Sequence, residues 1–175
     1  MEQQSSFKVG NHLTKRRLIF GCGNPLFGDD GFGERVIDQL LSNYSMPSDT
    51  AVLDVGTAIR ELLFDMLLSS RRPEEIIIID AMGVQGADAG QIFEIDIDLI
   101  HPAKISDYSL HQFPTTNLLK EIQNGTDIRI HLFVVQPGPL PDEVRPGLSG
   151  AVKAAVPVMC ERIITFIEAG RIQPA

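Results

Sequence analysis

A run of four consecutive isoleucines constrains the fold of this chain more than any other feature. The run lies within Glu75–Asp80 (EIIIID). A strand with one solvated face alternates apolar and polar residues, so an uninterrupted apolar run predicts a strand that is covered on both faces. Such coverage is typical of a parallel sheet between two layers of helices.

Strand-like and helix-like segments alternate through the rest of the 175 residues. Short apolar or β-branched runs predict further strands at residues 17–22, 51–55, 91–97 and 127–135, and periodicity predicts helices at 34–44, 57–70, 115–123 and 149–168. Thr57 is the expected start of the second helix, and Ser149 is the expected cap of the last. The order β-α-β-α-β-β-α-β-α predicts the α/β class. We expect a single three-layer domain, with helices on both faces of a twisted, mostly parallel five-stranded sheet and one antiparallel edge strand at 91–97.

Three regions follow from these segments: an α/β domain at 17–170, a flexible N-terminal extension at 1–16 and a short C-terminal tail at 171–175. The extension is polar and lacks the apolar centre of a signal peptide. No apolar run approaches the roughly 18–20 residues that would span a bilayer. We therefore expect a cytoplasmic protein without a membrane partner.

The charge balance and the cysteines exclude several classes of site. Fifteen basic residues against 23 acidic ones give a net charge of −8, which disfavours nucleic-acid binding. The same balance places no strong demand for a dimer, so we expect a monomer or a weak homodimer. Cys22 and Cys160 have no zinc-type spacing and are interpreted as small, reduced core residues.

A glycine-rich segment, GCGNPLFGDDGFG at 21–33, follows the first strand and precedes the first helix. It carries more glycine and acid than a plain turn requires, which indicates that a ligand lies against it. Its first two glycines agree with a dinucleotide-binding fingerprint, but Leu26 takes the place of the third glycine. Asp29 and Asp30 would also repel a pyrophosphate at the helix N-terminus. A dinucleotide-binding enzyme is thus the weaker alternative.

Three residues could instead form a metal site. Asp30 follows the first strand, Asp80 ends the isoleucine strand, and His111 lies in the segment 99–114, which has no helix or strand period. Carboxylates and imidazole suit zinc or nickel, and three protein ligands leave a position open for water or substrate. From the residues alone, Asp30 could equally cap a helix, Asp80 could bind a loop, and His111 could be a surface residue.

The glycine-rich segment resembles the G-x-G-N-x-x-x-x-D-[DE]-x-x-G signature of the [NiFe]-hydrogenase maturation endopeptidases. The similarity extends over residues 17–167 and includes Asp54-x-Gly56-Thr57-Ala58, Asp80-Ala81, Ser109-Leu110-His111-Gln112 and Gly147-Leu148-Ser149. The chain departs from the family in its N-terminal extension and in Leu110, where some relatives have proline.

The resemblance implies an endopeptidase, with 17–170 as its catalytic domain, that removes the C-terminal extension of a hydrogenase large-subunit precursor after nickel insertion. It further implies that Asp30, Asp80 and His111 are the catalytic, nickel-recognising residues and that Asp29 is structural or supporting. The nickel would arrive on the precursor, with zinc or cadmium as substitutes in vitro. A non-cleaving assembly factor with the same ligands remains an alternative. Loops 82–90 and 137–147 are candidate walls for the substrate.

Overall fold

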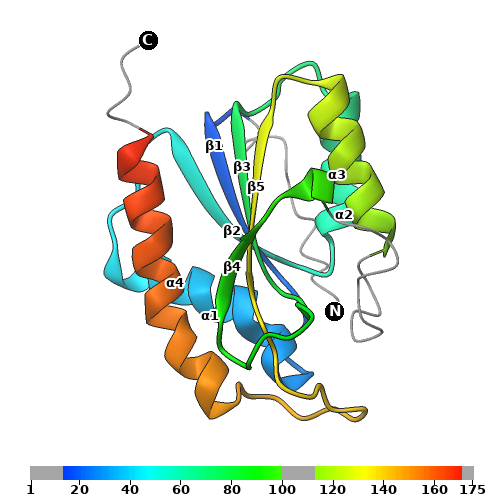
Figure 1. Ribbon diagram of the computed structural model, residues 1–175. Coiled ribbons are helices and arrows are strands. Elements are labelled where there is room, and N and C mark those ends of the chain that lie inside the picture. The colour runs from blue at the N-terminus through cyan, green and yellow to red at the C-terminus, as the bar shows by residue number, and fades with distance from the viewer. Residues whose placement is uncertain (1–13, 100–112, 171–175) are drawn as a thin grey trace, which may run out of the picture.

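A five-stranded sheet forms the centre of the computed structural model, which describes residues 14–99 and 113–170 (Figure 1). Its strands are β1 (Arg17–Cys22), β2 (Thr50–Gly56), β3 (Glu75–Ala81), β4 (Ile92–Ile95) and β5 (Arg129–Val135). They lie in the order β2-β1-β3-β5-β4, and β4 is antiparallel to β5 while the other pairs are parallel. The predicted α/β class and the antiparallel edge strand are confirmed.

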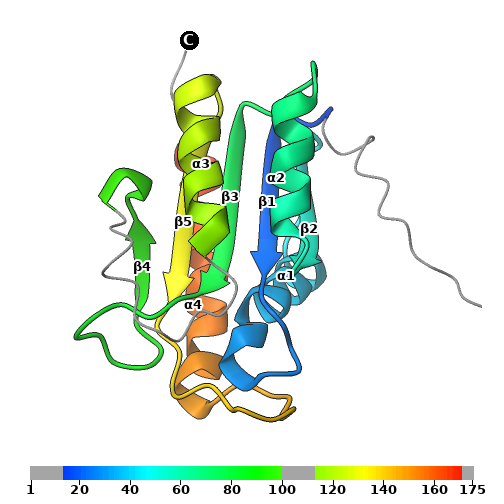
Figure 2. The same ribbon diagram turned by 90° about the vertical axis from the view of Figure 1, so that its right-hand side faces the viewer.

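Two helices cover each face of this sheet, as Figures 1 and 2 show. Helices α1 (Phe32–Asn43) and α4 (Gly150–Ala169) pack on one face, and α2 (Ile59–Leu68) and α3 (Phe113–Gly125) pack on the other. The isoleucines of β3 explain both layers, since Ile77 and Ile79 contact the first pair of helices while Ile76 and Ile78 contact the second. All four are at most 3% exposed.

The structure corrects two of the predicted boundaries. Helix α2 begins at Ile59 without a side-chain cap, so the prediction of a start at Thr57 is wrong. Gly56 adopts φ +50°, and the N–H of Ala58 then donates to the carbonyl of Val55, so a turn occupies the residues before the helix. Strand β4 is shorter than expected, because residues 97–99 form a 3-10 helix, η3 (Ile97–Leu99).

Other expectations depend on parts of the chain outside the described ranges. Residues 1–13 of the expected extension, the expected tail and His111 all lie there. Among the described helices, none combines the length and the apolar composition that crossing a bilayer requires. Cys22 and Cys160 are both buried and unpaired with each other, which confirms their interpretation as reduced core residues.

A buried ion pair joins β1 to β3 at the amino end of the sheet. Arg17 and Glu75 face each other in register and are 3% and 6% exposed, and Nε of Arg17 donates to Oε2 of Glu75. Arg129 and the ring of His131 lie 3.3 and 3.7 Å from the other carboxylate oxygen. Burial raises the pKa of Glu75, but the Arg17 hydrogen bond and charge, with Arg129 and His131, lower that pKa on balance.

We predict that Glu75→Gln lowers the free energy of unfolding by about 3–5 kcal/mol, because Arg17 keeps its charge in a buried position without a counter-charge. Denaturant titration at pH 7 measures this loss. The folded-state pKa of Glu75 lies below its ordinary value of 4.5, so its stabilisation is complete above that pH and disappears as pH falls through the folded-state value. The deficit of the variant should therefore shrink in acid.

Glu74→Gln is the matched control. Glu74 is 60% exposed and accepts a 2.8 Å hydrogen bond from the exposed Arg16, so its loss should leave the free energy of unfolding close to that of the wild type. Equal losses of unfolding free energy in the two variants would show that the buried Arg17–Glu75 pair stabilises the fold no more than an exposed pair does.

Candidate active site

Three aspartates gather where the parallel strands end. Asp30 follows β1 in the 3-10 turn η2 (Gly28–Gly31), while Asp54 and Asp80 lie near the ends of β2 and β3. In Figure 2 this carboxyl edge is the lower edge of the sheet. All three carboxylates act on Cys22, whose thiol pKa is raised well above 9.0, first by burial and then by the charges of Asp80, Asp54 and Asp30.

The structure thus brings Asp30 and Asp80 to one edge, as the sequence predicted. Asp54, from the motif Asp54-x-Gly56-Thr57-Ala58, is a third acid at this edge for which the sequence predicts no role. Its position near the end of an apolar run is the pattern that could have indicated its place at the edge. In residues 14–99 and 113–170, no three acids, histidines or cysteines are arranged to hold a metal ion. His111, the predicted third ligand, lies outside these ranges.

Close backbone contacts fix the position of Asp30. Gly23 has φ +114°, and a Cβ at that position would overlap the carbonyl oxygen of Asp30. The N–H of Asn24 donates to Oδ2 of Asp30 at 2.7 Å. A phosphate-binding loop would offer such an N–H to its ligand, so this hydrogen bond disfavours the dinucleotide alternative.

Other carboxylate groups also lie at or near this edge. The carboxylate of Asp80 accepts a 2.8 Å hydrogen bond from the N–H of Ala81. Glu34, in the first turn of α1, has its pKa raised by burial and then by the charges of Asp54 and Asp38. Negative charge concentrated at the ends of parallel strands favours the approach of a cation.

Asp29 has a different role from Asp30. Its carboxylate is 4% exposed and accepts three hydrogen bonds, from Gly138 N at 2.8 Å, Ser149 N at 2.6 Å and Ser149 Oγ at 2.9 Å. Ser149 also caps α4, accepting from the N–H of Val152 at 3.5 Å. Asp29 therefore fastens both ends of the loop 138–149 to η2, which is a structural role, and the predicted cap at Ser149 is confirmed.

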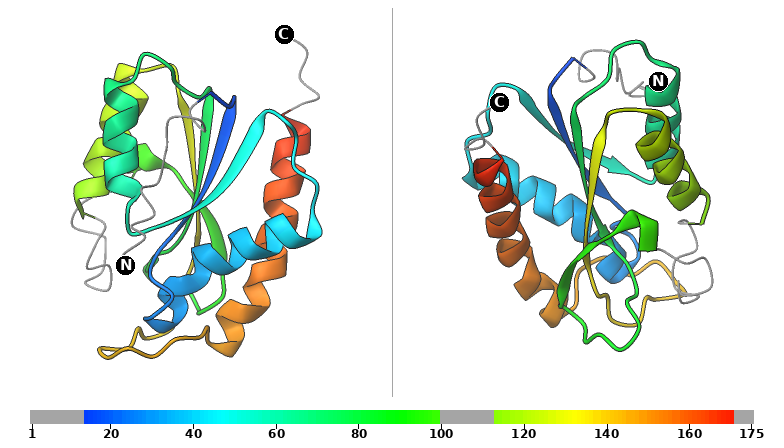
Figure 3. Two further views of the ribbon diagram at one scale, coloured as in Figure 1. Left: turned by 180° about the vertical axis from the view of Figure 1, so that it is seen from behind. Right: turned by 45° about the horizontal axis from the view of Figure 1, so that its top comes forward.

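Gln136 holds the neighbouring loop 82–90 in place, and sequence reasoning missed this residue. Its Oε1 accepts from Val84 N at 2.6 Å, and its backbone carbonyl accepts from Gly90 N at 2.8 Å. A single glutamine after a strand gave no signal of this contact. Figure 3 shows the loops 82–90 and 137–149 at the same edge of the sheet as η2.

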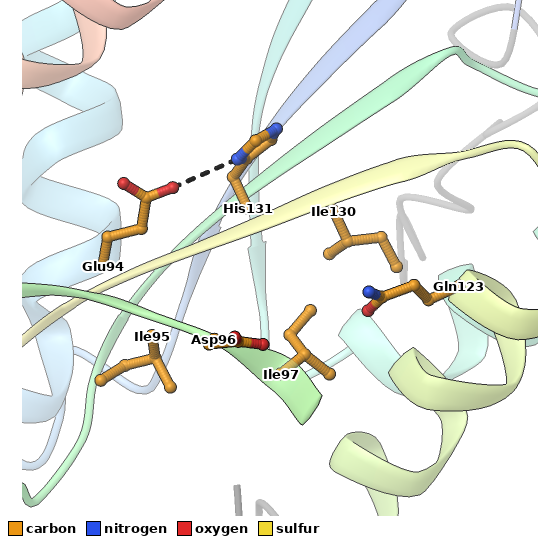
Figure 4. A pocket seen from close by; sticks show the side chains of 7 residues that line it. All are labelled: Glu94, Ile95, Asp96, Ile97, Gln123, Ile130 and His131. Atoms are coloured by element: carbon orange, nitrogen blue, oxygen red, sulfur yellow. Dashed lines mark hydrogen bonds and ion pairs between the residues drawn. The ribbon is translucent and has the colours of Figure 1, made fainter. Parts of the chain in front are cut away.

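A groove of about 380 Å³ lies elsewhere, where β4 diverges from β5 (Figure 4). Its lining includes Glu94 and His131, which are joined at 3.2 Å, and the side chain of Gln123. His131 is level with Ile77, in the amino-terminal half of β3. The groove contains none of the predicted site residues, so the carboxyl edge remains the candidate active site.

The fold places this chain in the class of open α/β proteins, in which ligands generally bind at the carboxyl ends of the parallel strands. The sequence profile of the hydrogenase maturation proteases matches residues 34–166. The chain therefore belongs to the hydrogenase maturation protease family, and it is a protease.

Individual relatives agree with this assignment. The chain is 34% identical to a Methanocaldococcus jannaschii protein described as a hydrogenase maturation protease, over 86% of this chain and 96% of the relative. Its fold is similar to that of the hydrogenase maturating endopeptidase HybD from Escherichia coli, with 27% identity, a TM-score of 0.72 and coverage of 89% and 93%. A [NiFe] hydrogenase maturation protease HybD from Thermococcus kodakarensis is similar over 86% and 98%, with 27% identity and a TM-score of 0.63.

We predict that Asp29→Ala lowers the free energy of unfolding by about 2–4 kcal/mol, because it leaves three donors without their charged acceptor. Hydrogen exchange should accelerate at the amides of Gly138 and Ser149, which mass spectrometry of the 138–149 peptides would detect. Asp38→Ala, at a 60% exposed position on α1, is the control and should change neither quantity. Unchanged exchange in the Asp29 variant would mean that other contacts hold the loop.

Proposed function

We propose that this protease removes the C-terminal extension of a [NiFe]-hydrogenase large-subunit precursor after nickel insertion, and that Asp30, Asp80 and His111 recognise the inserted nickel. The observation that carries the proposal is the convergence of Asp30 and Asp80 at the carboxyl edge of a chain that belongs to the hydrogenase maturation protease family. The name of the similar E. coli structure, a hydrogenase maturating endopeptidase, agrees with it.

Nickel in this proposal is part of the substrate. Carboxylate and imidazole groups bind nickel, and an open set of three ligands can receive a metal that the precursor already holds. The acidic edge attracts such a cation, and the hydrogen bond from Asn24 orients one oxygen of Asp30 before the metal arrives. Contact with the nickel would place the adjacent peptide bond against the protein.

Hydrolysis adds water across that peptide bond, releasing a carboxylate on the mature subunit and an amine on the extension. The metal can assist by holding the attacking water or by polarising the scissile carbonyl. Cys22 is only 4% exposed, and burial raises the pKa of its thiol, so it lacks the exposed, activating surroundings of a nucleophilic cysteine. The protein's own contribution is to recognise, position and surround the bond that is cut.

We predict that purified protein releases the C-terminal peptide from nickel-loaded precursor and leaves nickel-free precursor intact. Asp30→Asn, Asp80→Asn and His111→Ala should each slow release by at least about a hundredfold, because each removes a ligand that positions the bond. Mass spectrometry of the released peptide measures the rate. Zinc- or cadmium-loaded precursor tests whether another divalent ion substitutes for nickel.

Asp65→Asn, at an exposed position on α2, is the matched control and should process the precursor at the wild-type rate. Full processing by a site variant would remove that residue from the proposed nickel site. Equal cleavage of nickel-free precursor would contradict nickel recognition. Stable binding of the precursor without any product would favour the non-cleaving assembly factor.

A further inference from the structure

Two loops at the carboxyl edge are joined by one parallel β-bridge. Phe27 and Arg145 form the bridge, in which Gly28 N donates to the carbonyl of Arg145 at 2.9 Å and Arg145 N donates to the carbonyl of Leu26 at 2.8 Å. The left view of Figure 3 shows these segments side by side, one in blue before α1 and the other in orange before α4. The loop that carries Asp30 and the proline-rich loop thus form one surface.

Leu26 and Val144 directly precede the two members of this bridge. The carbonyl of Leu26 accepts from the N–H that follows Val144, so the two residues lie on adjacent backbone segments. Leu26 is 47% exposed and Val144 is 64% exposed. The other large exposed apolar residues of the described chain lie on helices; they are Leu41, Phe64, Leu68 and Val158. Exposed apolar residues on adjacent segments beside a candidate site are typical of a contact surface.

Hydrogen bonds hold this pair at a fixed position relative to Asp30. Leu26 N donates to Oδ1 of Asn24 at 3.1 Å, and Asn24 N donates to the Asp30 carboxylate. On the other side, Asp29 fastens both ends of the loop that carries Val144. An apolar surface that is already fixed loses little conformational freedom when a partner covers it.

We propose that the Leu26–Val144 pair is a docking surface for the stretch of precursor chain beside the scissile bond, and that it receives an apolar side chain of that stretch. This inference rests on the proposed function. The precursor is the expected occupant of this surface, because a chain whose metal lies on Asp30 must pass close to the loop that carries Asp30. A second copy of this protein fits poorly, since two side chains offer far less than the roughly 1,200 Å² of a stable interface.

Docking of this kind contributes binding energy that is the same in the ground state and the transition state. Its loss should therefore raise KM and leave kcat unchanged. This split separates the docking surface from the nickel-recognising residues, whose loss should reduce kcat.

The experiment measures cleavage of nickel-loaded precursor by Leu26→Ser and Val144→Ser variants over a range of precursor concentrations. Each should raise KM by about five- to thirtyfold, which corresponds to the free energy of burying one partly exposed apolar side chain. The value of kcat should change by less than about twofold. The double variant should raise KM by less than the product of the two single-variant increases, because one substrate side chain contacts both positions. Leu26→Met and Val144→Ile should retain the wild-type KM.

Leu41→Ser and Val158→Ser are matched controls, at 58% and 54% exposure on α1 and α4, and should leave KM unchanged. Thermal melting of every variant verifies that the fold is intact. Unchanged KM in both loop variants, an equal rise in the helix controls, or a fall in kcat alone would overturn the docking surface.

If wild-type protein cleaves nothing, the proposed function fails and docking is measured directly by titrating the nickel-loaded precursor against fluorescently labelled protein. Weaker binding by Leu26→Ser and Val144→Ser than by the helix controls would then support the docking surface. Equal binding by all four variants would overturn it.

Discussion

Close packing of the end of β1 against the first turn of α1 determines the arrangement of the carboxyl edge. A Cβ at Gly33 would overlap the backbone of Cys22 and lie 2.8 Å from the carbonyl oxygen of Ile79. Because Gly33 has no side chain, the helix begins directly on the ends of β1 and β3. The turn η2 is then held above those strand ends, and its aspartates lie at the edge and not in the surrounding solvent.

Within that turn, two adjacent carboxylates serve different purposes. A 3-10 turn advances by about 120° per residue, so neighbouring side chains point in different directions. Asp29 is turned inward, where Gly138 and Ser149 satisfy its charge, and Asp30 is turned toward the edge that Asp80 shares. An acid that fastens a loop and the acid that we propose to recognise nickel thus occupy consecutive positions.

The layers of the fold and the grouping of Asp30 with Asp80 could be predicted from the sequence, because apolar runs and strand order act through local periodicity and one topological rule. Contacts between irregular segments could not. The pairing of Asp29 with Ser149, of Gln136 with Val84 and of Phe27 with Arg145 depends on how loops meet after the sheet has formed, and loops have no period. Local propensity also failed at the start of α2, where the positive φ of Gly56 prevailed over Thr57 as a cap. The role of His111 stays a prediction.

The hydrogen bonds that the Asp29 carboxylate accepts from Ser149 span 120 positions of the sequence. Contacts of such separation raise the contact order, and they close late in folding. During synthesis the acidic turn emerges early, but the loop that completes the edge emerges only after β5. A nascent or partly folded chain would therefore expose its aspartates before the loop that Asp29 holds is in place, and the carboxyl edge would be complete only when the domain is nearly whole.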